Sequence, residues 1–342
     1  MEFTIDMNTI WFILIGLLLT GYAILDGFDL GVGALHLLTK TDTERRIMLN
    51  SIGPVWDGNE VWLVTGGGAL FAAFPHVYAT VFSGFYTAFI LLLCVLIFRA
   101  VSIEFRSKRK NPRWRQTWDI AFSVSSIFIA LLAGVALGNI IQGIPLGSDK
   151  EFAGNFWTLI NPYALSVGIT TMALFMMHGA IYVLMKTEGE MQNKIQGWVN
   201  NTIIFFVICY ATVTMATLIY QSHMVTHFRN FPPIFIIALL NMLAIANIPR
   251  EIHHGREFRA FLSSCASILT LMIIFAIGIF PNLVLSSPNP EYSLNIYNAS
   301  SSIKTLKIML TIAIIGIPFV LAYTISIYWI FRGKVRLDAM SY

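Results

Sequence analysis

The chain has 342 residues, of which 56% are hydrophobic and only 12% are charged. Soluble domains are typically about 45–50% apolar and about 25% charged, and a chain of this length cannot bury so much apolar surface in one aqueous core. The composition therefore excludes soluble, disordered and collagen-like proteins and predicts a polytopic helical membrane protein. The net charge of +4 does not indicate a nucleic-acid partner, because the basic residues lie at the ends of apolar runs.

Apolar runs long enough to cross a bilayer, about 20 residues each, occur nine times along the chain. They cover residues 10–38, 58–76, 79–101, 118–141, 163–185, 198–220, 232–249, 260–283 and 305–331. The second and third runs are separated only by a short turn around Pro75 and His76, and the seventh run is short. We therefore expect an all-α protein of nine transmembrane helices, with eight as the alternative.

The distribution of lysine and arginine favours nine spans. With the N-terminus outside and the C-terminus inside, 18 of the 22 basic residues fall on one side of the membrane. The other side holds Lys150, Arg229, Lys304 and Lys307. Because short cytoplasmic loops are enriched in Lys and Arg, the basic side is predicted to face the cytoplasm.

Two segments indicate an internal duplication. Residues 33–44 close the first run and residues 179–190 close the fifth, with similar patterns at an offset of 146 residues. Both runs cross in the same direction, as a parallel repeat requires, although apolar helix ends can also look alike by chance. The expected organisation is a four-helix bundle in residues 1–150, a second in residues 151–290, and a peripheral ninth helix with a cytoplasmic tail in residues 291–342.

Acidic residues inside the first two runs are the first candidate functional residues. Charge at membrane depth costs at least about 2.5–3.5 kcal/mol, so its presence needs a reason. Asp26 and Asp29 lie three residues apart and therefore share one helix face. Asp57 and Glu60 repeat this spacing at the start of the second run, where they could equally be first-turn acids favoured by the helix dipole.

Two further charged residues extend this set. Arg99 ends the third run and Asp119 opens the fourth, so four successive helices are expected to bring five carboxylates and one guanidinium to the same depth. Such a cluster offers titratable groups for moving protons or ions from the cytoplasm. The alternative is a structural network in which Arg99 neutralises one aspartate.

Histidines and cysteines give little support for a bound metal or haem. His178 is the one histidine well inside an apolar run, and a membrane haem b usually needs two axial ligands on facing helices. A packed or hydrogen-bonded His178 is therefore favoured, and the chain is predicted to carry no haem. Cys94, Cys209 and Cys265 form no CxxC pattern, so neither a disulfide framework nor a metal site is expected.

Several longer motifs together carry a resemblance that covers essentially the whole chain. They lie at residues 26–33, 41–52, 56–62, 67–75, 82–86, 106–108, 138–143, 161–162 and 280–281. In this order they resemble subunit II of the cytochrome bd-type quinol oxidases, including the cyanide-insensitive members. Compared with the ubiquinol-type members, the outer segment at residues 221–231 is short.

The resemblance implies a heterodimer with a subunit I that holds haems b558, b595 and d and the quinol-oxidising loop. The pair would oxidise quinol and reduce O2 to water in the bacterial cytoplasmic (inner) membrane, taking the protons for water from the cytoplasm and so forming a proton gradient. Subunit II would itself carry no haem. Small accessory subunits and a structural quinone in subunit II are further expectations that no residue of this chain assigns.

The family also implies roles for individual residues. The aspartate that closes its DGFD motif and the aspartate of its WDGN motif are associated with proton uptake toward haem d, and here these are Asp29 and Asp57. Its third-span arginine corresponds to Arg99, with a role in charge compensation or assembly.

The expected proton path therefore comprises Asp29, Asp57, Asp26 and Glu60. Arg99 and Asp119 are expected to be compensating or structural charges. The alternative functions are a stand-alone proton-coupled transporter, a haem b anchor that uses His178, and a structural scaffold.

Overall fold

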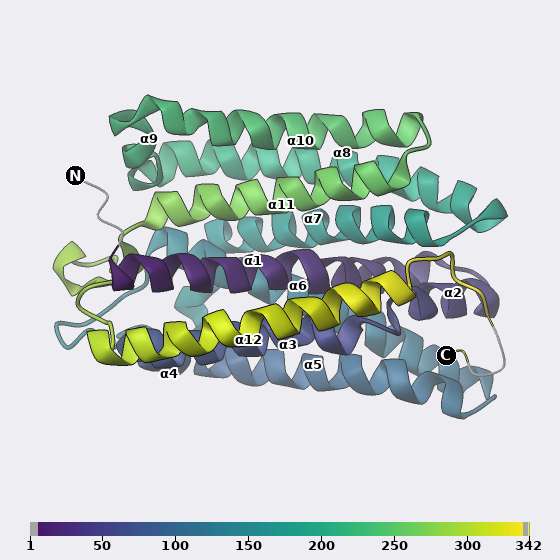
Figure 1. The fold of residues 1–342 in the computed structure, drawn as a ribbon, viewed down its shortest axis with the longest axis horizontal. Helices are drawn as coiled ribbons and strands as arrows, with labels where there is room; N and C mark the ends of the chain where they lie inside the picture. The colour runs from purple at the N-terminus through teal and green to yellow at the C-terminus, as the bar shows by residue number, and fades with distance from the viewer. Residues whose placement is uncertain (1–5, 338–340, 342) are drawn as a thin grey trace.

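The computed structural model describes residues 6–337 and 341, and its helices run side by side along the long axis of the molecule (Figure 1). Eight helices in this part of the chain are long and apolar enough to cross a membrane. They are α1 (Met7–Leu35), α5 (Tyr86–Phe105), α6 (Pro112–Gln142), α7 (Pro162–Lys186), α8 (Gly189–Tyr220), α10 (Phe235–His253), α11 (Glu257–Ile279) and α12 (Ile303–Ile330). Their lengths and composition are those of a multi-pass membrane protein.

The remaining predicted span is α3 (Trp56–Ala73), which packs against α1. It is not among the eight apolar helices because its first turns carry Asp57, Asn59 and Glu60. At about 1.5 Å per residue its 18 residues measure about 27 Å, which is close to the thickness of the hydrocarbon layer. The nine-span count stays a prediction.

The predicted run at residues 79–101 is wrong at its start. The chain leaves the helical conformation at Phe74 (φ −131°, ψ 67°), and a separate short helix, α4 (Pro75–Gly84), begins at once. Proline favours such a start because it lacks the N–H group that a helix interior needs. A second break at Phe85 precedes α5. The predicted run therefore combined the second half of α4 with most of α5, which are two separate helices.

Helix α1 lies at the centre of the fold, where it packs against α3, α6, α7 and α11. Its residues 26–33 are all buried. A side-chain carbon added to Gly31 would overlap the carbonyl group of Phe175, and one added to Gly179 would overlap the backbone of Gly31. Such small residues let membrane helices approach closely, so the α1–α7 contact fixes the buried half of α1.

An amphipathic helix, α2 (Asp42–Ile52), joins α1 to α3 and lies outside the predicted spans. It begins with a capping box, in which Thr41 and Glu44 satisfy each other's backbone N–H groups. Lys194 Nζ on α8 donates to Glu44 Oε1 at 2.8 Å. Burial opposes ionisation of Glu44, but hydrogen bonds from Lys194 and from the backbone of Lys40 and Thr41 outweigh it and lower the pKa of Glu44.

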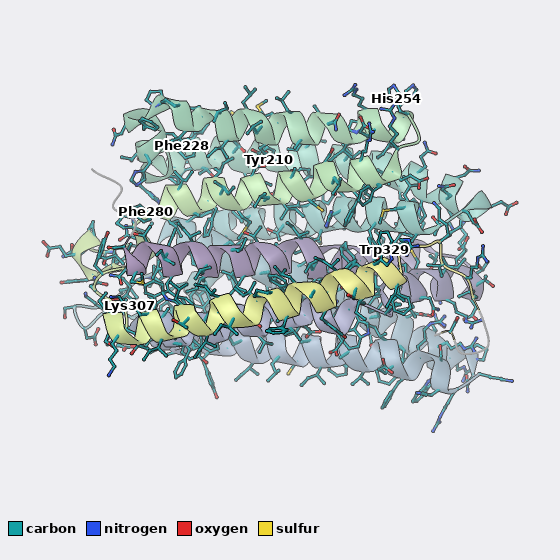
Figure 2. The ribbon with its side chains drawn as sticks, in the orientation of Figure 1. Tyr210, Phe228, His254, Phe280, Lys307 and Trp329 are labelled. Carbon is teal, nitrogen blue, oxygen red and sulfur yellow. The ribbon has the colours of Figure 1, made fainter. Side chains whose placement is uncertain are left out.

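The two ends of the bundle differ in character. Figure 2 places Phe228, Phe280 and Lys307 at one end, and His254 and Trp329 at the other. The end with Phe280 also holds the short helix α9 (Thr226–Asn230) and two short antiparallel strands, β1 (Asn282–Val284) and β2 (Leu294–Asn295). Short 3-10 turns cover His36–Leu38, Arg106–Lys108, Phe156–Leu159, Ser222–Val225, Pro232–Ile234 and Pro290–Tyr292.

Helix α12 lies along the surface, beside α1 and α3 (Figure 1). Leu306 is the one residue within this helix that is buried. Near the other end, the half-buried Tyr328 turns toward the core. The helix therefore covers one side of α3 while most of its own surface is open.

Candidate functional site

A buried ion pair joins α5 to α1. Arg99 donates from Nη1 to Asp26 Oδ2 at 3.0 Å and from Nη2 to Asp26 Oδ1 at 2.5 Å. Both side chains are 0% exposed. Paired, two-point contacts between guanidinium and carboxylate are the strong form of this interaction, so Arg99 offsets the charge of Asp26 directly.

Asp29 lies one helical turn further along α1 and is also fully buried. Its Oδ2 is 3.9 Å from Arg99 Nη2 and accepts a hydrogen bond from Asn59 Nδ2 at 2.8 Å. Its Oδ1 is buried and has no hydrogen-bond partner among the described residues. Asp29 is therefore a second buried carboxyl group beside the same guanidinium, and it is held less closely than Asp26.

Glu60 on α3 completes the group around Arg99. Its Oε2 lies 3.6 Å from Arg99 Nη1, and its side chain is 21% exposed. We call Asp26, Asp29, Glu60 and Arg99 the arginine cluster. Of the six charged residues expected at one depth, the structure brings these four together, and Glu60 connects the buried part of the arginine cluster to the surface of α3.

Asn59 and Tyr328 support Asp29 from α3 and α12. Tyr328 donates its hydroxyl hydrogen to Asn59 Oδ1 at 2.8 Å, while Asn59 Nδ2 donates to Asp29 Oδ2 and, at 3.3 Å, to the carbonyl of Leu25. Asn59 belongs to a motif that the sequence singled out, but Tyr328 has no local signal. It is separated from Asn59 by 269 residues.

Asp57 does not join the arginine cluster. It is exposed in the first turn of α3, and it forms no ion pair with another residue in the described part of the chain. The same helix face also exposes Val61, Val64 and Phe71. Asp57 is therefore placed at the edge of an open apolar stripe, within one turn of Glu60.

Asp119 lies in a different cluster from Arg99, which corrects the expectation of one shared site. Asp119 Oδ1 accepts from His36 Nε2 at 2.7 Å and from Arg106 Nε at 2.6 Å, and its Oδ2 accepts from Arg45 at 2.8 Å. Arg106 also donates to Asp42 at 2.8 Å. Arg106 itself is buried against Asp119.

Substitution of Asp119 by alanine is expected to destabilise the protein. The change leaves the buried Arg106 without its main partner, and breaking a buried pair from one side costs about 3–5 kcal/mol. Asp42→Ala is the matched control, because Asp42 is 47% exposed and exposed pairs contribute about 0–1 kcal/mol. Heat inactivation of the two variants in detergent measures the difference, and equal losses would contradict a structural role for Asp119.

His178 on α7 is buried and fully engaged by neighbours. Its Nε2 donates to the carbonyl of Ile24 at 2.9 Å, and its Nδ1 lies 2.7 Å from Ser264 Oγ. The ring stacks on Phe261 with centroids 5.0 Å apart. This is the packed, hydrogen-bonded arrangement that the sequence favoured.

Two other features concern ligands. In residues 6–337 and 341, no three His, Cys, Asp or Glu side chains are grouped as a metal ion would need. A groove of about 620 Å³ lies between α1, α11 and the short helix α9, which carries His227. Its walls are mostly apolar side chains, which include Phe12, Leu17, Leu269 and Phe280.

Comparison with known proteins shows the family to which the chain belongs. Residues 7–331 match the family model for cytochrome bd terminal oxidase subunit II. The chain is 36% identical to the cytochrome bd-I ubiquinol oxidase subunit 2 of Escherichia coli K12, over 97% of this chain and 96% of that protein. It is 35% identical to the cytochrome bd ubiquinol oxidase subunit 2 of Bacillus subtilis 168, over 98% and 99% of the two chains.

A solved structure shows the same fold. A chain in the structure of bd oxidase from Geobacillus thermodenitrificans superposes with a TM-score of 0.78 at 17% identity, covering 95% of this chain and 98% of that chain. The family model and the two relatives each cover nearly the full length of the chain. The chain is therefore a member of the cytochrome bd terminal oxidase subunit II family.

Proposed function

We propose that this chain is the haem-free subunit of a quinol oxidase of the inner membrane, and that it gives protons a route from the cytoplasm. Its partner would be a subunit I that holds the haems, oxidises quinol and reduces O2 to water. The curated relatives are ubiquinol oxidase subunits, which supports the reaction. The observation that carries the proton route is the arginine cluster.

The charges of the arginine cluster support a proton-transfer role. Asp26 and Asp29 are fully buried, and one guanidinium lies between them. Arg99 carries one positive charge and directs its two side-chain hydrogen bonds at Asp26, so it can offset only one of the two negative charges. An uncompensated carboxylate at membrane depth is costly, so Asp29 is best suited to bind and release a proton as charge moves nearby.

The open face of α3 is the proposed contact with subunit I. Asp57, Val61, Val64 and Phe71 are exposed along one side of this helix, and Glu60 reaches the same surface. A partner docked there would meet both acidic side chains directly. The proposed route runs from Asp29 past Glu60 to Asp57 and then into subunit I, where the haems lie.

The orientation is proposed from charge. The ion pairs Arg106–Asp42 and Lys194–Glu44 link segments that all belong to the predicted basic side. Lys307, on the other predicted side, lies at the opposite end of the bundle from Trp329 in Figure 2. Nine spans with the N-terminus outside and the C-terminus inside would place the arginine cluster in the cytoplasmic half of the membrane.

The groove between α1 and α11 is the proposed place for a structural quinone. Its volume of about 620 Å³ and its apolar walls suit an isoprenoid tail rather than a polar substrate. Organic extraction of the purified complex followed by mass spectrometry tests this proposal. A Leu269→Trp substitution, which would fill the groove, should remove the quinone signal, and an unchanged signal would place the quinone elsewhere.

Co-purification tests the proposed function as a whole. The tagged chain is isolated from native membranes in mild detergent, and a reduced-minus-oxidised spectrum of the eluate is recorded. We expect a larger subunit to co-purify with haem b and haem d bands. If subunit I is expressed and the chain still elutes alone and colourless, while carrying a proton flux of its own in vesicles, the chain is instead a transporter.

Asp57→Asn is expected to slow O2 reduction by at least about tenfold without loss of haem. The substitution removes a proton-exchanging side chain, and such side chains typically contribute about 10²–10⁴-fold to the rate of a reaction. O2 consumption and proton uptake are measured on the purified complex. Val61→Ala, on the same open face and one turn away, should leave turnover near normal. Normal turnover and normal proton uptake in Asp57→Asn would refute its place in the path.

A further inference from the structure

A cavity of about 490 Å³ lies at the end of the bundle where α2, α7 and α12 meet. The side chains that line it include Asn50, Ser51, Tyr182, Lys186, Tyr328 and Val335. Polar and apolar residues share its wall, and a cavity of this size with several polar partners accommodates water molecules. We call it the tail cavity, because the segment after α12 forms part of its wall.

The segment after α12 is held in place over the tail cavity by α7. Lys186 Nζ donates to the carbonyls of Phe331 and Gly333, and the backbone N–H of Val335 donates to the carbonyl of Lys186 at 2.9 Å. Phe331 and Gly333 are themselves exposed. The tail cavity therefore opens at the protein surface, beside a segment that hydrogen bonds keep fixed.

Tyr328 connects this cavity to the arginine cluster. Its side chain lines the cavity, and its hydroxyl donates to Asn59 Oδ1. The Nδ2 group of the same Asn59 amide donates to Asp29. Two hydrogen bonds of 2.8 Å thus separate the cavity wall from Asp29. Tyr182, the other phenol on the wall, donates instead to the carbonyl of Ser51 at 3.0 Å.

The Asn59 amide has a fixed role in this chain of contacts. Asn59 Nδ2 donates to Asp29 and to the carbonyl of Leu25, and Asn59 Oδ1 accepts from Tyr328. An amide neither gains nor loses a proton readily. Asn59 therefore orients Asp29 rather than carrying protons itself. The other oxygen of this carboxyl group, Asp29 Oδ1, is buried and has no hydrogen-bond partner among the described residues.

We propose that the tail cavity is the cytoplasmic entrance of the proton route, and that Tyr328 and Asn59 are positioning residues that present Asp29 to water entering from it. This inference rests on the proposed proton role of Asp29. A proton would pass from water in the cavity to Asp29, and the groups that face this carboxyl are Asp26, Arg99, Glu60 and the two phenols.

Tyr328→Phe removes the hydroxyl group and leaves the ring. In the complete oxidase we expect proton uptake to fall about fivefold, the effect of losing one hydrogen bond, with haem content unchanged. Because uptake then limits turnover, the rate should decline more steeply as the pH of the cytoplasmic side rises. Tyr163→Phe is the matched control, because it also removes a phenol hydroxyl with a 2.8 Å side-chain contact, to Thr217, outside the tail cavity, and it should behave like the parent. Equal effects of the two variants, or none in Tyr328→Phe, would overturn the positioning role.

A blocking experiment tests the entrance independently. Val335→Cys is labelled with a bulky, membrane-impermeant thiol reagent in inside-out vesicles, with the parent treated in the same way to account for its own cysteines. We expect uptake to fall severalfold on labelling. Full labelling without inhibition would place the entrance elsewhere. Asp29→Asn is measured in parallel, because normal uptake in that variant refutes the proton role of Asp29 itself rather than only the entrance.

Discussion

Arg99→Leu is expected to prevent the oxidase from accumulating in the membrane. The substitution removes the single guanidinium beside Asp26, Asp29 and Glu60. Two of these carboxyl groups are fully buried, and leaving a buried charge unpaired costs about 3–5 kcal/mol. The measurement is the amount of chain that co-purifies with its haem-bearing partner, relative to the parent.

A double substitution separates charge balance from loss of the arginine side chain. Arg99→Leu combined with Asp26→Leu replaces the ion pair with two apolar side chains, an exchange that is often neutral or stabilising. We expect the double variant to accumulate better than Arg99→Leu alone. Asp26→Leu alone should be milder than Arg99→Leu, because Asp29 and Glu60 remain to face the arginine. If the double variant accumulates no better than Arg99→Leu, charge compensation is not the role of Arg99.

The convergence of the arginine cluster could be predicted because membrane helices restrict where charge can lie. Asp26 and Asp29 share a helix face by their spacing, and the depth of Arg99 in its own run matches theirs. At membrane depth such charges need a partner, so a positive side chain on a neighbouring helix was expected to meet them. The structure confirms this for Asp26, Asp29, Glu60 and Arg99.

The separate grouping of Asp119 could not be predicted in the same way. Its depth resembles that of Arg99, but its partners are Arg45 within α2 and His36 and Arg106 in the 3-10 turns that follow α1 and α5. Depth along a helix says nothing about rotation around it, and rotation decides which neighbour a side chain meets. The exposure of Asp57 has the same cause, because α3 turns this residue away from α1.

The contacts of α12 could not be predicted from the sequence for a different reason. Tyr328 meets Asn59 across 269 residues, and no local pattern reports which face of a surface helix turns inward. The break expected around Pro75 and His76 is found at Phe74, whereas the break at Phe85 was not predicted. The breaks at Phe74 and Phe85 leave α4 as a short helix between them, within a stretch whose apolar composition continues through both breaks.

Asp29→Asn is expected to reduce proton uptake by at least about a hundredfold while the complex still assembles, since proton-exchanging side chains contribute about 10²–10⁴-fold. Asparagine has nearly the same shape, and its side-chain oxygen can still accept from Asn59. It removes only the ability to bind and release a proton. Proton uptake and O2 consumption are measured on the purified complex, with the haem spectrum recorded as the check on assembly.

The comparison with Asp26→Asn makes the result specific to Asp29. Asp26 holds Arg99 at two points, so its substitution should lower the yield of assembled complex more than the turnover of the complex that forms. Asp29 lies 3.9 Å from the same guanidinium and has a free oxygen, so its substitution should do the reverse. If both variants lose yield and keep turnover, the arginine cluster is structural, and the protons that form water enter through the partner subunit.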